Sequence, residues 1–223
     1  METLQEQAYA HLKNMIINGD LSYQEIYSET KLSKNLQISR TPFRDAMHRL
    51  MQEGFIDIIP SKGFCLHQLS AKDVTETFQV RSALECFCTL EITKQADTAD
   101  AKKLFHDLDI IMKKLHEIMI TTHSIKDFCT YDFEFHTKII YFLKNEQFSS
   151  IFDSFMYRMQ KLAQLSLSHE NRMEETYAEH LAIFSSMKQG DVTHIYEKTL
   201  IHMNRPKGIN LEDLTSLLGN DTL

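Results

Sequence analysis

Glycine, proline and tryptophan are scarce in this sequence. Its 223 residues include 6 Gly, 3 Pro and no Trp. Because Gly and Pro interrupt regular structure and build turns, this composition argues against a turn-rich β-sandwich and against a glycine-loop nucleotide fold. It favours long, uninterrupted helices, and the length suggests one or two domains.

Cysteine pairs and long apolar segments are also missing. The four cysteines show no CxxC spacing and are too few to cross-link a chain of this length, so we expect them to stay reduced. The N-terminus lacks a basic region followed by an apolar run, and no stretch approaches the roughly 18 apolar residues that a membrane span needs. The sequence therefore predicts a cytoplasmic protein with no membrane partner.

Positive charge is in deficit over the whole chain. Lys and Arg total 24 against 31 for Asp and Glu, a formal net charge of -7, which on its own argues against a nucleic-acid partner. The deficit is uneven, however. Residues 1–69 carry 7 basic and 8 acidic side chains, whereas residues 70–223 carry 17 and 23. The total therefore does not exclude a DNA-reading surface in the first part of the chain.

Residues 1–69 have the pattern of three helices followed by a hairpin. Helical spacing of apolar residues predicts three helices, over 2–17, from about Ser28, and over 40–53. Two short β-prone runs, at 55–59 and 64–67, flank a turn sequence at 60–63. Two helices joined by a tight turn and followed by a hairpin form a winged helix-turn-helix, which we predict for residues 1–69.

The second helix of the predicted turn carries cations at its N-terminal end. Arg40, Thr41 and Arg44 lie where a recognition helix presents side chains to bases and phosphates in a major groove. The simpler interpretation is that two arginines one turn apart are surface residues of an ordinary amphipathic helix. Composition alone does not separate these two interpretations.

The sequence around these cations resembles a known signature. Residues 38–46 read Ile-Ser-Arg-Thr-Pro-Phe-Arg-Asp-Ala and, continuing through 49–54 to 60–64, resemble the winged helix of the GntR family of bacterial transcription regulators. The resemblance implies that operator DNA is contacted by Ser39, Arg40, Thr41, Arg44, Lys62 and Gly63. Thr30 stands where some members carry a further DNA-contacting arginine, so that contact is not implied here.

From Ser70 onward the sequence is almost entirely helical in pattern. Ser70 followed by Asp73 predicts a helix start, and the later breaks predict about six helices, over 71–95, 98–120, 124–143, 146–169, 172–189 and 191–204. We predict a mostly α protein in which residues 70–204 form an all-helical ligand-binding and dimerisation domain. Residues 205–223 are predicted to form a C-terminal tail, as a short helix or a loose segment.

Four residues in this helical region could bind a metal. Asp132 and His136 lie four residues apart and share one face of a predicted helix, while His180 and His202 fall in two later helices. Three imidazoles and a carboxylate suit a divalent transition metal such as Zn²⁺ or Ni²⁺. With 11 histidines in the chain, such a pair also arises by chance.

The same residues resemble the FCD-type effector domain of the FadR branch of GntR regulators. In that family the positions of Asp132, His136, His180 and His202 bind a metal inside a helical bundle. Arg81 and Glu85 match the family's first-helix motif. Arg81 is then either a cation that faces an organic-acid effector or an ion-pair partner of Glu85, and the structural role is the favoured one.

The resemblance implies a transcription regulator and not an enzyme. A small-molecule effector, expected to be a carboxylate, would bind near the metal and alter the affinity of a homodimer for double-stranded operator DNA. Two alternatives stay open at this point. The four residues could serve a metal-dependent hydrolase, or the metal could be purely structural in a regulator that has no effector.

Overall fold

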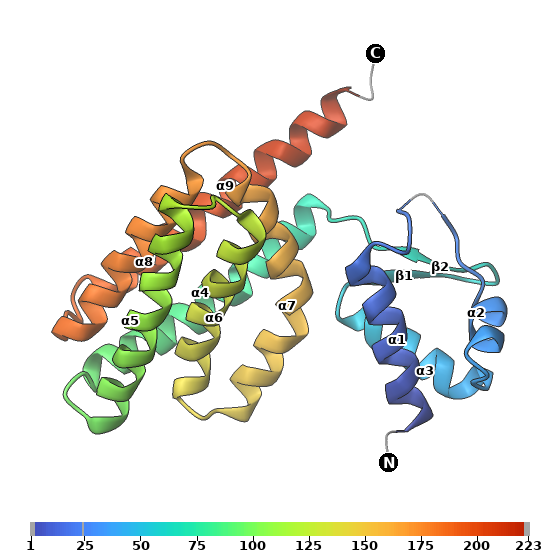
Figure 1. The fold of residues 1–223 in the computed structure, drawn as a ribbon, viewed down its shortest axis with the longest axis horizontal. Coiled ribbons are helices and arrows are strands. Elements are labelled where there is room, and N and C mark those ends of the chain that lie inside the picture. Colours follow the sequence, from blue (N-terminus) through green and yellow to red (C-terminus); the bar gives the residue numbers. More distant parts are fainter. Residues whose placement is uncertain (1–2, 24, 221–223) are drawn as a thin grey trace. The chain divides into compact units, whose positions relative to one another are not determined.

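The computed structural model describes residues 3–23 and 25–220, with side chains up to residue 216. It divides into two compact units. One holds the residues up to Leu69 together with 154–158, and the other holds the remaining residues from Ser70 onward. Figure 1 labels the helices and strands of both units.

The first unit has the predicted winged helix-turn-helix architecture. Its described elements are α1 (Leu4–Asn18), α2 (Glu29–Asn35), α3 (Arg40–Gln52), β1 (Ile56–Ile59) and β2 (Gly63–Leu66). The strands pair antiparallel, with Ile56 opposite Leu66. The predicted N-cap of α2 is confirmed, because the Ser28 hydroxyl accepts a hydrogen bond from the backbone of Lys31.

One apolar core holds this unit together. Leu12 of α1, Phe43 and Leu50 of α3 and Phe64 of β2 are fully buried within it. Helices α1 and α3 pack against each other, and α2 packs on α3. Helix α3 buries Phe43 and Leu50, whereas Arg40 and Arg44, on a neighbouring face of the same helix, are exposed to solvent.

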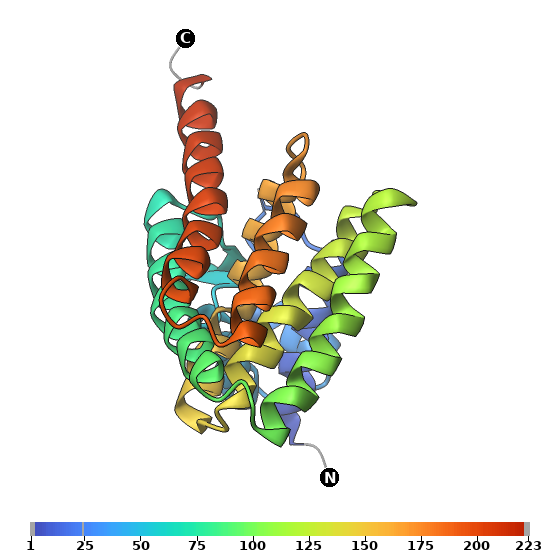
Figure 2. The same ribbon diagram turned by 90° about the vertical axis from the view of Figure 1, so that its left-hand side faces the viewer.

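The second unit is the predicted all-helical bundle. Within the described residues it contains six helices, α4 (Ala71–Lys94), α5 (Ala99–Ile120), α6 (Ile125–Phe142), α7 (Glu146–Leu167), α8 (Arg172–Gln189) and α9 (Ile195–Asn220). Helix α4 packs against α6, α8 and α9, and α5 packs against α6 and α8 (Figure 2). The predicted start of α4 is confirmed by a capping box between Ser70 and Asp73.

The expected end of the last helix at residue 204 is wrong. Helix α9 begins at Ile195 and continues through Pro206 to Asn220, beyond the ends of its neighbours (Figure 2). Proline removes only one helical hydrogen bond, the one to the carbonyl of His202. Beyond the proline, Asn210 ties the helix to α7, because its amide donates to the carbonyls of Pro206 (2.8 Å) and of Leu162 in α7 (3.2 Å). Residues 221–223 of the predicted tail lie outside the described residues.

All four cysteines are free thiols. Among residues 3–23 and 25–220, no helix is both long enough and apolar enough to cross a membrane.

Two glycines of the first unit provide a test of the wing geometry. Gly63 has φ +132°, and a Cβ there would collide with the backbone oxygen of Tyr27, whereas Gly19 has φ +79° and open space around it. We expect Gly19→Ala to lower the free energy of unfolding by about 1–2 kcal/mol. Gly63→Ala should lower the free energy of unfolding by about 2 kcal/mol more, because the backbone of Tyr27 must also shift. Urea denaturation measures both, and equal costs would contradict this packing of the wing.

Candidate functional site

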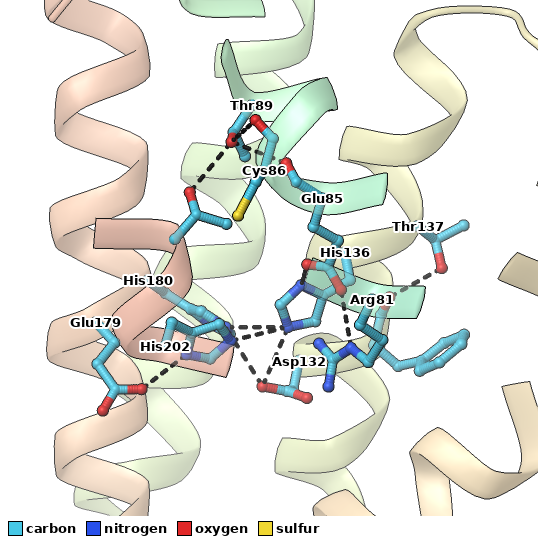
Figure 3. Close-up of polar contacts among 12 residues, drawn as sticks. Arg81, Glu85, Cys86, Thr89, Asp132, His136, Thr137, Glu179, His180 and His202 are labelled. Carbon is cyan, nitrogen blue, oxygen red and sulfur yellow. Dashed lines mark hydrogen bonds and ion pairs between the residues drawn. The ribbon is translucent and has the colours of Figure 1, made fainter. Parts of the chain in front are cut away.

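Three histidines meet in the centre of the bundle. His136 of α6, His180 of α8 and His202 of α9 are all buried. Their Nε2 atoms lie 3.2 Å (His180 to His202) and 3.3 Å (both other pairs) apart (Figure 3). These three residues form a group that could hold a metal ion.

Two carboxylates fix the proton positions of two of these rings. Glu85 of α4 lies 2.5 Å from Nδ1 of His136, and Glu179 of α8 lies 2.7 Å from Nδ1 of His202. A carboxylate only accepts hydrogen bonds, so each Nδ1 carries the proton that it donates. A neutral ring then keeps a lone pair on Nε2. Both lone pairs point at the centre of the cluster.

The surroundings keep Glu85 and Glu179 ionised and lower the pKa values of His180 and His202. Burial alone would raise the pKa of Glu85, but the charges and hydrogen bonds of Arg81 and His136 outweigh it and hold that pKa at about 2. Burial, together with the charges of His202 and His136, holds the pKa of His180 well below its ordinary value. Burial likewise lowers the pKa of His202. Neutral imidazole is the form that binds metals.

Hydrogen bonding among the histidines cannot satisfy this arrangement. His180 can donate one Nε2 proton, to one of two facing lone pairs, so the other acceptor is left without a donor from the cluster. A tetrahedral ion with Zn–N bonds of about 2.0–2.1 Å would separate its nitrogens by roughly 3.3 Å. The observed separations match that value. The donor set therefore fits a divalent transition metal.

Asp132 completes the set of four predicted ligands. It is buried one helical turn before His136, and its Oδ1 lies 3.5 Å from Nε2 of His180 and 4.0 Å from Nε2 of His136. The structure thus brings all four predicted residues to one place, from three helices. His180 differs from the other two histidines because its Nδ1 is buried without a hydrogen-bond partner. The ring of Phe135 stacks on His180, with centroids 4.3 Å apart.

Each outer carboxylate is paired with a buried arginine. Arg81 donates through Nε to Glu85 (2.8 Å), so the ion pair favoured for Arg81 is present. Arg172 donates two bonds to Glu179 (2.8 and 2.9 Å) and is only 2% exposed. The sequence interpretation missed Arg172. Its spacing of seven residues from Glu179, two turns along one helix, was the available signal.

A small cavity lies beside the histidines. Its volume of about 20 Å³ leaves room for roughly one water molecule. Five helices contribute to its wall, which includes Arg81, Asp132, His136, Arg172, His202 and Pro206. Two guanidinium groups and three of the candidate metal ligands therefore line one small space.

The predicted DNA-contacting residues lie together on the first unit. Ser39 is the N-cap of α3, and its side chain makes no capping hydrogen bond, while Arg40, Thr41 and Arg44 are exposed in the first turns. A groove of about 320 Å³ runs between α2, α3 and the wing, and its lining includes Ser28, Glu29, Thr30, Arg44, His48, Lys62 and Gly63. The structure adds contacts that the sequence did not predict, from Glu29 and Thr30 to the two arginines.

Two family models match the chain. The model for bacterial regulatory proteins of the gntR family matches residues 4–66, and the FCD domain model matches residues 76–205. The chain belongs to the gntR family and carries an FCD domain. The resemblance seen in the sequence is therefore confirmed. Members are transcription regulators, so this protein is a DNA-binding transcription regulator and not an enzyme.

Individual relatives agree with this assignment. The chain is 28% identical over 198 residues to the uncharacterized HTH-type transcriptional regulator YdhC of Bacillus subtilis, covering 89% of this chain and 87% of YdhC. It is 26% identical over 166 residues to the gluconate operon transcriptional repressor of Bacillus licheniformis, covering 74% and 65%. The solved structure of E. coli McbR/YncC shares the fold, with a TM-score of 0.67, 17% identity and 98% and 100% coverage.

The two arginines that meet Glu179 offer a matched stability test. Arg172 is buried, whereas the Arg205 side chain is 52% exposed and donates to the same carboxylate at 3.0 Å. Arg172→Ala should lower the free energy of unfolding by about 3–5 kcal/mol, because the buried carboxylate of Glu179 would lose two hydrogen bonds and its buried counter-charge. Arg205→Ala should cost no more than about 1 kcal/mol. Denaturant titration compares the two variants, and an equal, small loss would show that Arg172 is dispensable.

Proposed function

We propose that this regulator binds double-stranded operator DNA as a homodimer and that an organic-acid effector, held beside a divalent transition metal, changes its affinity for the operator. The metal would be Zn²⁺ or Ni²⁺. The observation that carries the proposal is the convergence of three imidazole nitrogens beside a cavity lined by two buried arginines.

The exposed end of α3 supports the DNA part of the proposal. Arg40 and Arg44 can each present paired N–H donors to guanine, and Ser39 and Thr41 suit phosphate oxygens at a helix N-terminus. Lys62 and Gly63 would place the wing in the adjacent minor groove. Two-fold symmetry would set two such helices on half-sites about one helical turn, or a related spacing, apart.

The four buried residues would hold the metal. Asp132, His136, His180 and His202 would be its ligands, and Glu85 and Glu179 would orient two of the imidazoles through their Nδ1 protons. When bound, the ion would supply positive charge and an open position for a carboxylate oxygen. Arg81 and Arg172 would add two fixed cations on the cavity wall, so the cavity favours an anion.

The size of the cavity suggests how the effector acts. It holds about one water, so a carboxylate larger than this must displace some of the five surrounding helices. The bundle would therefore have two arrangements that differ in affinity for the effector, which is the condition for a ligand to shift an equilibrium. A relative named for a gluconate operon is consistent with a carboxylate effector.

Substitution of Arg40 and Arg44 tests the DNA-binding part of the proposal. A duplex selected by the wild-type protein from a randomised library serves as the operator. Arg40→Ala and Arg44→Ala should each weaken its binding at least about tenfold, because each removes a base contact, while thermal stability is kept. Arg49→Ala removes the same charge from another face of α3 and should bind nearly as the wild type does. Wild-type binding by both variants would show that α3 does not read DNA.

Metal removal tests the sensing part. A chelator should leave the helical circular dichroism intact but abolish the rise in melting temperature that small carboxylates, gluconate among them, produce in the metal-loaded protein. His180→Gln should lose the bound metal in elemental analysis, whereas His194→Gln, at an exposed histidine, should keep it. Global unfolding on chelation would indicate a structural ion instead. Equal stabilisation by carboxylates with and without metal would contradict metal-assisted sensing.

A further inference from the structure

One of the exposed arginines of α3 is tied to an acid from another helix. Arg44 donates through Nε to Oε1 of Glu29, at 2.8 Å, and Glu29 opens the first turn of α2. The two side chains differ in exposure, 60% for Arg44 and 18% for Glu29. The acid is thus held in the groove between α2 and the wing, and the free end of the arginine points to solvent.

The other arginine of the pair is held by a neutral group. Arg40 donates through Nη2 to the hydroxyl of Thr30, at 3.0 Å. Consecutive residues of α2 therefore position the two arginines, one through a full charge and one through a hydroxyl. This difference allows the effect of charge to be separated from the effect of position.

We propose that Glu29 is a specificity-determining residue that acts through Arg44. By engaging Nε, it fixes the guanidinium and leaves the Nη donors for a base edge, and by cancelling one positive charge it lowers attraction to phosphates of any sequence. The inference rests on the proposed function of α3 as the reading helix, because Glu29 matters to DNA only if Arg44 touches it.

Two physical effects follow from this pairing. An unrestrained arginine loses much rotamer entropy when it binds a base, and a side chain fixed beforehand loses less. Fixing Arg44 therefore strengthens binding to the base pair that its fixed geometry matches more than binding to other base pairs. Each phosphate neutralised by a protein cation steepens the salt dependence of binding by about 0.9 in the log–log slope. Glu29 removes one such cation from the non-specific total.

A purely structural role for Glu29 predicts different behaviour. An acid in the first turn of α2 also stabilises that helix through its dipole. That role would change stability and leave base preference unaltered. It would also act whether or not Arg44 is present.

The experiment measures base preference and salt slope on one set of variants. Duplexes selected from a randomised library give a preference for each base pair, and a duplex of unrelated sequence gives the salt slope. The variants are Glu29→Ala, Glu29→Gln, Thr30→Ala and Glu25→Gln. The last removes the same charge at an exposed position four residues earlier.

The proposal predicts a distinct result for each variant. Glu29→Ala should lower preference at one base pair by at least about threefold and steepen the salt slope by about 0.9. Glu29→Gln, which keeps an acceptor oxygen, should show the slope change with a smaller loss of preference. Thr30→Ala should lower the preference at a different base pair without changing the salt slope. Glu25→Gln should change neither the preference nor the slope by these amounts.

A double-mutant cycle makes the test decisive. In an Arg44→Ala background, Glu29→Ala should have no further effect on preference or slope if it acts through Arg44. Unchanged preference and slope in both Glu29 variants, or an equal effect with and without Arg44, would overturn this inference alone. Wild-type binding by Arg44→Ala itself would instead overturn the proposed reading helix.

Discussion

The convergence of three imidazole nitrogens in the centre of the bundle is the constraint on which the second unit depends. His136, His180 and His202 come from three helices and are all buried. Polar groups in such a place are costly unless each finds a partner. Two hydrogen-bonded series of side chains supply most of the partners. One is Arg81–Glu85–His136, and the other is Arg172–Glu179–His202. A metal ion would accept the lone pairs that point into the centre of the cluster.

The same constraint shapes the cavity beside the histidines. The arginines that neutralise Glu85 and Glu179 also line it, so two guanidinium groups face a space that is only large enough for about one water. The proposed effector would have to compete for these groups and move helices. A comparable device appears on the first unit, where Arg44 is held by Glu29 and Arg40 by Thr30. In both units, arginines are held in place by specific hydrogen-bond partners.

Much of the fold could be predicted because it is encoded locally. The spacing of Phe43, Ala46 and Leu50 defines α3, and the Ser70–Asp73 capping box marks the start of the bundle. The Asp132–His136 pair is also local, and the family resemblance supported its grouping with His180 and His202, which lie in two later helices. Contacts that join distant segments were harder to predict. The Glu85–His136 contact spans 51 residues, and the Asn210–Leu162 contact, which ties α9 to α7 beyond Pro206, spans 48.

The central claim is that the histidine cluster binds a metal, and anomalous X-ray diffraction from crystals of the full chain, recorded on both sides of the Zn and Ni absorption edges, tests it most directly. The account predicts a single strong anomalous peak at about 2.0–2.2 Å from Nε2 of His136, His180 and His202 and from an Asp132 oxygen. No peak at this position after the protein has been supplied with both metals, or a peak bound by other residues, would contradict it.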